Sequence, residues 1–371
     1  MYEGRTLTAE EEAAITAEIE AIDQQLSEMN GTKYKSYEPK SNKVDLNGIV
    51  GKVITEKSDD AIFLTPMKIA VHERDISRVV PSGISLLDKR IIGFNKGELS
   101  VWSGSNGSGK SSLLSQLAIE SVDNGFKVAL YSGELRADRV LNWIHLQCAG
   151  KKYAIGTKYE NYYTVPNEIR TKINQWMDGK LYIYNNEHSS KVEEVVQAIK
   201  ECIEKHRIDV LIIDNLMSLD LASVVGEKFE KQTNLVLALT NLCKLKNVVI
   251  HFITHPRKTM TFLRKNDISG TADITNAADN VFLVHRCNTD FKKSIKEYLG
   301  IKDDNPLLRY DNVIEVCKNR DLGISDEFIG LYFEKESKRF LNMQNERKIY
   351  KWEEDKDGFI KEYDQGEIPF K

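Results

Sequence analysis

The segment G-S-N-G-S-G-K-S at residues 104–111 constrains the fold of this chain more than any other feature. It matches G-x-x-x-x-G-K-[ST] in full and lies between an apolar run, residues 99–102, and an amphipathic segment, residues 111–123. A strand that ends in such a loop and continues as a helix presents backbone N–H groups and the positive helix end to a phosphate. We therefore predict a nucleotide-binding α/β domain.

The residue types of this loop indicate the ligand. Its glycines let the backbone curl around phosphate groups, while Lys110 can reach the β and γ oxygens and Ser111 can offer a hydroxyl to Mg²⁺. We predict ATP, or another nucleoside triphosphate, and Mg²⁺ as cofactors. The predicted nucleotide-binding residues are Gly104, Ser105, Asn106, Gly107, Ser108, Gly109, Lys110, Ser111 and Ser112.

Apolar strands alternate with amphipathic helices from about residue 81 to residue 340. This order is typical of a mostly parallel central sheet flanked by helices. A capping box, formed by Ser190 and Glu193, is predicted to start one of the helices. The predicted strands are 99–102, 128–132, 181–184, 210–213, 248–253, 281–284, 313–316 and 328–332, and the predicted helices include 111–123, 190–205 and 229–245.

The segments on either side of residues 80–340 have a different character. Residues 1–31 are predicted to form an amphipathic helix with a capping box at Thr8 and Glu11 and a narrow apolar stripe. This helix is either a subunit-linking arm or a helix that lies on its own domain. Residues 32–79 are a linker or small extension with short strands near 49–53 and 61–64, and residues 341–371 are a charged tail.

Composition excludes several classes of protein. No apolar run is long enough to span a membrane, and the N-terminus lacks the basic and apolar regions of a secretory signal, so we expect a cytoplasmic protein. The five cysteines are scattered without metal-ligand spacing. The net charge of −4 predicts that any contact with nucleic acid is local.

Two carboxylates can complete the chemistry of the phosphate loop. Asp214 ends an apolar strand, where it can hold Mg²⁺ together with Ser111. Glu134 follows the strand 128–132 and can orient or deprotonate an attacking water. Taken singly, Asp214 could also be a strand-ending cap, and Glu134 a surface glutamate.

Further motifs between about Gly83 and Phe340 resemble those of the hexameric helicases of the DnaB class, most closely the Twinkle and phage primase-helicase branch. The resemblance implies that this chain has the RecA-like P-loop ATPase core of that family. One position differs, because Asn276 stands where the family has glutamine. The similar segments are S-G-E-L at 132–135, D-N-L at 214–216, T-H-P-R-K at 254–258, S-G at 269–270, N-A-A-D-N at 276–280 and C-K-N-R at 317–320.

The resemblance implies roles for individual residues. Glu134 would be the catalytic base, and His255 would sense the γ-phosphate. Arg320, accompanied by Lys318, would act as a finger on ATP bound to the neighbouring subunit. Lys110 and Asp214 complete the predicted catalytic set.

A basic loop after His255 would touch single-stranded DNA in a central channel, with Phe262 available for base stacking. The predicted DNA-binding residues are Arg257, Lys258, Arg264 and Lys265. On the sequence alone this segment could also be an ordinary surface loop, and His255, Lys318 and Arg320 could be polar residues at strand ends.

These observations predict an ATP-dependent replicative DNA helicase that forms a homo-oligomeric ring, expected to be a hexamer. The resemblance implies 5′ to 3′ movement on single-stranded DNA at a replication fork. Primase, single-strand-binding protein and polymerase are candidate partners, and the first 80 residues show no primase motif. The alternatives are a RecA-type recombinase or DNA-remodelling ATPase, and a nucleotide-dependent regulatory scaffold.

Overall fold

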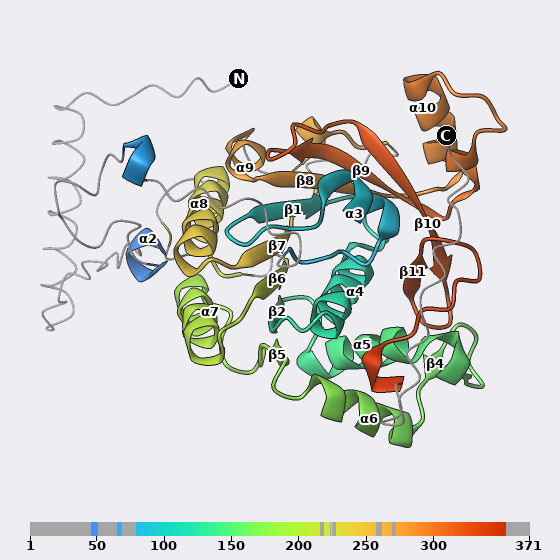
Figure 1. Cartoon of the computed structure of the whole chain (residues 1–371), viewed down its shortest axis with the longest axis horizontal. Helices are drawn as coiled ribbons and strands as arrows, with labels where there is room; N and C mark the ends of the chain where they lie inside the picture. Colours follow the sequence, from blue (N-terminus) through green and yellow to red (C-terminus); the bar gives the residue numbers. More distant parts are fainter. Residues whose placement is uncertain are drawn as a thin grey trace, which may run out of the picture. The chain divides into compact units, whose positions relative to one another are not determined.

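The computed structural model describes residues 46–50, 65–68, 79–215, 219–222, 224, 228–256, 262–268 and 272–353. Its main feature is a nine-stranded sheet (Figure 1). The strands are β1 (Leu99–Ser103), β2 (Val128–Ser132), β5 (Leu181–Ile183), β6 (Val210–Asp214), β7 (Val249–Ile253), β8 (Asn280–Arg286), β9 (Asn312–Asn319), β10 (Glu327–Glu334) and β11 (Arg339–Leu341). A separate two-stranded sheet consists of β3 (Ile155–Gly156) and β4 (Tyr163–Thr164).

The order of strands in the large sheet is β11-β10-β9-β8-β1-β7-β6-β2-β5. The six strands from β8 to β5 are parallel, whereas β9, β10 and β11 join antiparallel at one side. All residues of β1, β2, β6 and β7 are buried, as expected for parallel strands that are covered on both faces. The predicted mostly parallel sheet is confirmed, and each of the strands predicted between residues 99 and 332 overlaps an observed one.

Helices cover both faces of this sheet (Figure 1). One apolar core joins the sheet to α3, α4 and α5, and a second core joins the opposite face to α2, α7 and α8. The helices are α2 (Leu46–Val50), α3 (Ser85–Ile91), α4 (Lys110–Asp123), α5 (Ala137–Tyr153), α6 (Asn167–Met177), α7 (Val192–His206), α8 (Lys228–Lys246), α9 (Ala272–Ala277) and α10 (Thr289–Leu299). No helix in the described part of the chain is both long and apolar enough to cross a membrane.

Two local predictions are wrong. Residues 49 and 50 belong to the helix α2 and not to a strand, because Leu46 and Val50, one helical turn apart, are both buried in the second core. The predicted capping box at Ser190 and Glu193 is absent as well. The backbone of Ser190 accepts a hydrogen bond from the Asp220 N–H, and α7 begins two residues later, at Val192, without a side-chain cap.

The folded domain continues beyond residue 341, where the charged tail was predicted to begin. Tyr350 is 1% exposed, and its hydroxyl donates a 2.7 Å hydrogen bond to the Glu120 carboxylate on α4. Lys348 Nζ lies 2.5 Å from the same carboxylate, and the indole N–H of Trp352 donates to the Cys148 carbonyl. The predicted helix at 1–31, the predicted strand at 61–64 and the tail from 354 lie outside the described residues.

Candidate ATPase site

The phosphate loop connects β1 to α4 at the centre of the sheet. A side chain at Gly104 would collide with the carbonyl oxygen of Val284. At Gly109 the φ angle is 94°, and an added Cβ would lie 2.7 Å from the Phe340 ring. Glycine is therefore required at both positions by the packing of the loop against β8 and β11.

Lys110 lies folded over the loop that it follows. Its Nζ donates hydrogen bonds to the carbonyl oxygens of Gly104, at 2.8 Å, and Ser105, at 3.0 Å. Burial lowers the pKa of Lys110, whereas the nearby carboxylates of Asp214 and Glu134 act in the opposite direction. A bound phosphate would give this buried ammonium an additional anionic partner.

Ser111 and Asp214 fit the expected magnesium position. Asp214 is the last residue of β6, two strands away from β1, and burial raises its pKa while a hydrogen bond with Ser111 lowers it. A hydroxyl and a carboxylate in contact beside a phosphate loop match the way in which proteins bind Mg²⁺ through few protein oxygens and the nucleotide phosphates. When bound, Mg²⁺ would neutralise charge on the phosphates during transfer.

Three side chains from neighbouring strands meet beside this position. The strands β2, β6 and β7 are adjacent and parallel, so the residues that follow them share one edge of the sheet. The Asn215 side-chain amide donates to Glu134 Oε1 and lies 2.8 Å from His255 Nε2. His255 Nε2 is also 3.3 Å from Glu134 Oε1.

This cluster can hold a carboxylate ready to orient or deprotonate water. The Glu134 side chain is 50% exposed and therefore accessible, whereas Asn215 is 1% exposed and fixed in place. Asn215 was not predicted as a site residue. The D-N-L segment could have indicated Asn215 as a site residue, because a residue that directly follows a strand-ending ligand such as Asp214 lies at the same edge of the sheet.

The structure places Arg320 at the opposite edge of the sheet from the phosphate loop. Strand β9 is antiparallel to β8, with Asn319 opposite Asn280, and Asn280 in turn pairs with Ser100 near the start of β1. Arg320 lies 2.6 Å from Asp279 Oδ1 and donates to the Asn276 carbonyl. The length of β1, about 15 Å, therefore separates this guanidinium from the loop of its own chain.

Lys318 lies close to Arg320. Its Nζ donates hydrogen bonds to the carbonyl oxygens of Thr275, Asn276 and Ala278 at the end of α9. Burial, and then the positive charges of Arg320 and Lys265, lower the pKa of Lys318 to about 8. The predicted catalytic residues thus form two groups, one at each edge of the sheet.

The predicted DNA-binding residues are only partly described. Arg257 and Lys258 lie outside the described residues. Arg264 has partners within its own domain, since its guanidinium lies 3.2 Å from Glu315, 3.0 Å from Asp326 and 3.9 Å from the Tyr298 ring centre. Phe262, predicted to be available to bases, packs against His285, Phe291 and Tyr298.

Arg264→Ala should lower the free energy of unfolding by about 1–3 kcal/mol. Its neighbour Glu315 has a side chain that is only 1% exposed. The physical reason is that a buried carboxylate would lose a cation beside it. Urea unfolding of the intact chain measures this, with Lys265→Ala as a neighbouring control expected to change stability by less than about 0.5 kcal/mol. An unchanged unfolding free energy combined with weaker single-stranded DNA binding would instead assign Arg264 to DNA contact.

The fold and the site together define a RecA-like P-loop ATPase. Residues 79–342 match the family model described as DnaB-like helicase C terminal domain. The chain therefore belongs to the DnaB-like helicases, which are ATP-hydrolysing DNA helicases.

Two solved structures share the fold. One, described as the ATPase domain of another protein, is 17% identical with a TM-score of 0.55, and the similarity covers 71% of this chain and 91% of that one. A structure titled as a DnaB-like replicative helicase and its interactions with primase is 16% identical with a TM-score of 0.56. That similarity covers 71% of this chain and 63% of the other.

Proposed function

We propose that this helicase works as a closed ring, expected to be a hexamer, in which ATP is held between neighbouring subunits. The observation that supports this is the position of Arg320, which is 48% exposed and a strand length away from its own phosphate loop. A guanidinium that stabilises the transferring phosphoryl group must come close to it. Arg320 would therefore serve the nucleotide of the next subunit, with Lys318 beside it.

Within one subunit the remaining residues would divide the chemistry. Backbone N–H groups of residues 104–111 and Lys110 would bind the phosphates, and Ser111 and Asp214 would hold Mg²⁺. Glu134 would take the proton of the attacking water, while Asn215 would hold its carboxylate in place and His255 would respond to the γ-phosphate. Repeated hydrolysis around the ring would then move the predicted DNA-binding loop, with Arg257, Lys258 and Lys265, along a single strand.

We further propose 5′ to 3′ movement at a replication fork and membership of the Twinkle and phage primase-helicase branch, on the motifs at 132–135, 214–216 and 254–258. Such a protein would act in the cytoplasm of a bacterial or phage-infected cell. Primase is a candidate partner because a DnaB-like replicative helicase of the same fold is described with primase. Single-strand-binding protein and polymerase are further candidates.

A forked duplex tests this proposal. We expect ATP- and Mg²⁺-dependent strand separation on a fork with a 5′ tail, none on a fork with only a 3′ tail, and none by Lys110→Ala. Single-stranded DNA should stimulate ATP hydrolysis. Filament formation on DNA without strand separation would favour a recombinase, and slow hydrolysis that ignores DNA would favour a regulatory scaffold.

A further inference from the structure

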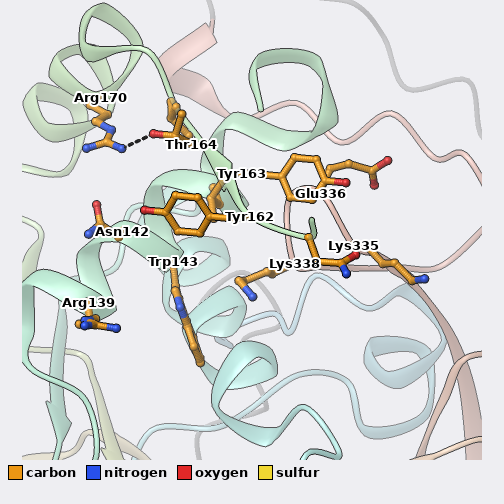
Figure 2. A pocket seen from close by; sticks show the side chains of 13 residues that line it. Arg139, Asn142, Trp143, Tyr162, Tyr163, Thr164, Arg170, Lys335, Glu336 and Lys338 are labelled. Carbon is orange, nitrogen blue, oxygen red and sulfur yellow. Dashed lines mark hydrogen bonds between the residues drawn. The ribbon is translucent and has the colours of Figure 1, made fainter. Parts of the chain in front are cut away.

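A cavity lies away from the phosphate loop, between α5, the β3–β4 hairpin and the turn from β10 to β11 (Figure 2). Its volume is about 580 Å³, within the range of pockets that hold small ligands or single nucleotide units. None of the residues predicted from sequence to bind nucleotide or DNA lines this cavity.

The cavity is strongly positive in a chain whose net charge is −4. Arg139, Arg170, Lys335 and Lys338 line it, together with a single carboxylate, that of Glu336. This carboxylate lies 3.6 Å from the ammonium of Lys151, which is not a lining residue. Among the described residues, no carboxylate forms an ion pair with the four lining cations, so an anionic ligand would supply the missing partner.

One of these cations also has an unused donor. The guanidinium of Arg170 donates a 2.7 Å hydrogen bond to the Thr164 hydroxyl, while its Nε is buried with no hydrogen-bond partner in the described structure. A buried donor without a partner is costly, so a shift of this side chain that lets Nε donate to an anion in the cavity would be favourable. This observation is independent of the excess of charge.

Aromatic rings accompany the cations. Trp143, Tyr162 and Tyr163 line the cavity, as do Lys335 and Lys338 (Figure 2). Tyr162 is 61% exposed although it is large and partly apolar. Cations interleaved with accessible rings are the combination with which proteins bind single-stranded nucleic acid, because every base can stack and every phosphate is negative.

We propose that this cavity is a second binding site for single-stranded nucleic acid, in which a base stacks on Tyr162 and the flanking phosphates contact Arg139, Lys335 and Lys338. The proposal rests on the proposed function only in taking nucleic acid as the ligand. The site is close to the proposed magnesium position, since Trp143 also lines a small cavity together with Ser111 and Asp214. A strand bound here would touch the helix α5, which begins three residues after Glu134.

Photo-crosslinking of the intact chain to a 5-iododeoxyuridine oligonucleotide, mapped by mass spectrometry, locates the contact. We expect crosslinks at Tyr162 or Trp143 in addition to any elsewhere. Crosslinks that fall only outside the cavity would overturn the proposal and leave the helicase function standing. The absence of any crosslink, together with ATP hydrolysis that DNA does not stimulate, would count against the helicase function itself.

Tyr162→Ala should weaken the binding of a single strand by about 5- to 150-fold, the effect of losing one base-stacking contact. Tyr159 provides a matched control, since it belongs to the same hairpin and is 64% exposed but does not line the cavity. Tyr159→Ala should bind as the wild type does. Equal effects of the two substitutions would contradict a site in the cavity.

Replacing both Lys335 and Lys338 by alanine should make the negative slope of log affinity against log salt shallower by about 1.4, since each lost single-strand phosphate contact contributes about 0.7. The pair Lys172→Ala and Lys205→Ala, exposed lysines outside the cavity, should leave the slope unchanged.

Equal labelling by free 5-iododeoxyuridine monophosphate would overturn the proposal in favour of a free-nucleotide site. Carbodiimide crosslinks from Lys335 or Lys338 to carboxylates of residues 1–31, persisting with DNA, would overturn it in favour of the chain's own acidic segment.

Discussion

An equimolar mixture of Lys110→Ala and Arg320→Ala chains is expected to hydrolyse ATP although neither variant does so by itself. Loss of an arginine finger lowers turnover by about 10³- to 10⁵-fold, and loss of a preorganised group on the phosphates by about 10²- to 10³-fold. In a randomly mixed ring, about one quarter of the interfaces would combine an intact loop with an intact finger. Steady-state ATPase activity in the presence of single-stranded DNA measures the recovery.

The sheet explains why the two losses should complement each other. Lys110 follows the carboxyl end of β1, whereas Arg320 lies beside the amino end of the same strand, where it contacts Asp279. The two cations cannot meet on one nucleotide within a chain, but two chains arranged head to tail can bring them together. Each mixed interface of the correct order would therefore contain a complete site.

Arg90→Ala provides a matched control. Arg90 is also a half-exposed arginine in an ion pair, with a side chain 54% exposed and 3.5 Å from Glu327, and its loss should leave activity intact. Mass measurements on the mixture must show exchange of subunits. If mixed rings form and hydrolysis stays absent, Arg320 does not act on a neighbouring nucleotide.

The substitution Glu134→Gln is expected to lower kcat for ATP hydrolysis by about 10²- to 10⁴-fold while nucleotide binding is retained. The amide keeps the size of the side chain but cannot accept a proton from water. Lys110 would still contact the phosphates, because the carboxylate of Asp214, which also raises the pKa of Lys110, is unchanged. Single-turnover hydrolysis and equilibrium binding of a fluorescent ATP analogue separate the two effects.

Asn215→Ala should also lower kcat, by up to about 10²-fold with an unchanged KM, because Asn215 only positions the Glu134 carboxylate. The Asn215 amide donates a hydrogen bond to Glu134 and lies beside His255. Without this amide the Glu134 carboxylate would still be present but would be free to move. Glu187→Gln is the control for both substitutions, because this glutamate follows β5 and its side chain is 76% exposed. Turnover of Glu134→Gln within about tenfold of the wild type would exclude Glu134 as the base.

Much of the ATPase domain could be predicted from local sequence. Strand β1, its glycine loop and α4 follow one another without interruption, so residues 104–111 alone predict where a phosphate can be bound. Asp214 could be identified because it ends an apolar run, and the carboxyl ends of parallel strands share one edge of a sheet. The alternation of strands and helices predicted the layered fold for the same reason, since each element carries its own periodicity.

Other features depend on contacts between distant parts of the chain. Tyr350 belongs to the domain because Glu120, 230 residues earlier, accepts its hydrogen bond, and nothing in the charged sequence around it predicts this. Arg264 looks like a DNA contact in a basic segment, yet Glu315 and Asp326 lie beside it in the fold. Composition reports the charge of a segment but not the partners that neutralise it.

The sequence by itself therefore determined the phosphate loop, the candidate ligands of Mg²⁺ and the family that its motifs resemble. Each of these can be recognised in a short segment of residues that are adjacent along the chain. Only the tertiary structure decided which edge of the sheet each charged residue occupies. It joined Asn215 to Glu134 and His255, and it separated Arg320 from Lys110 by the length of β1. The direction of β9 is the physical reason for this separation, because an antiparallel strand carries its last residues to the edge where its parallel neighbours begin.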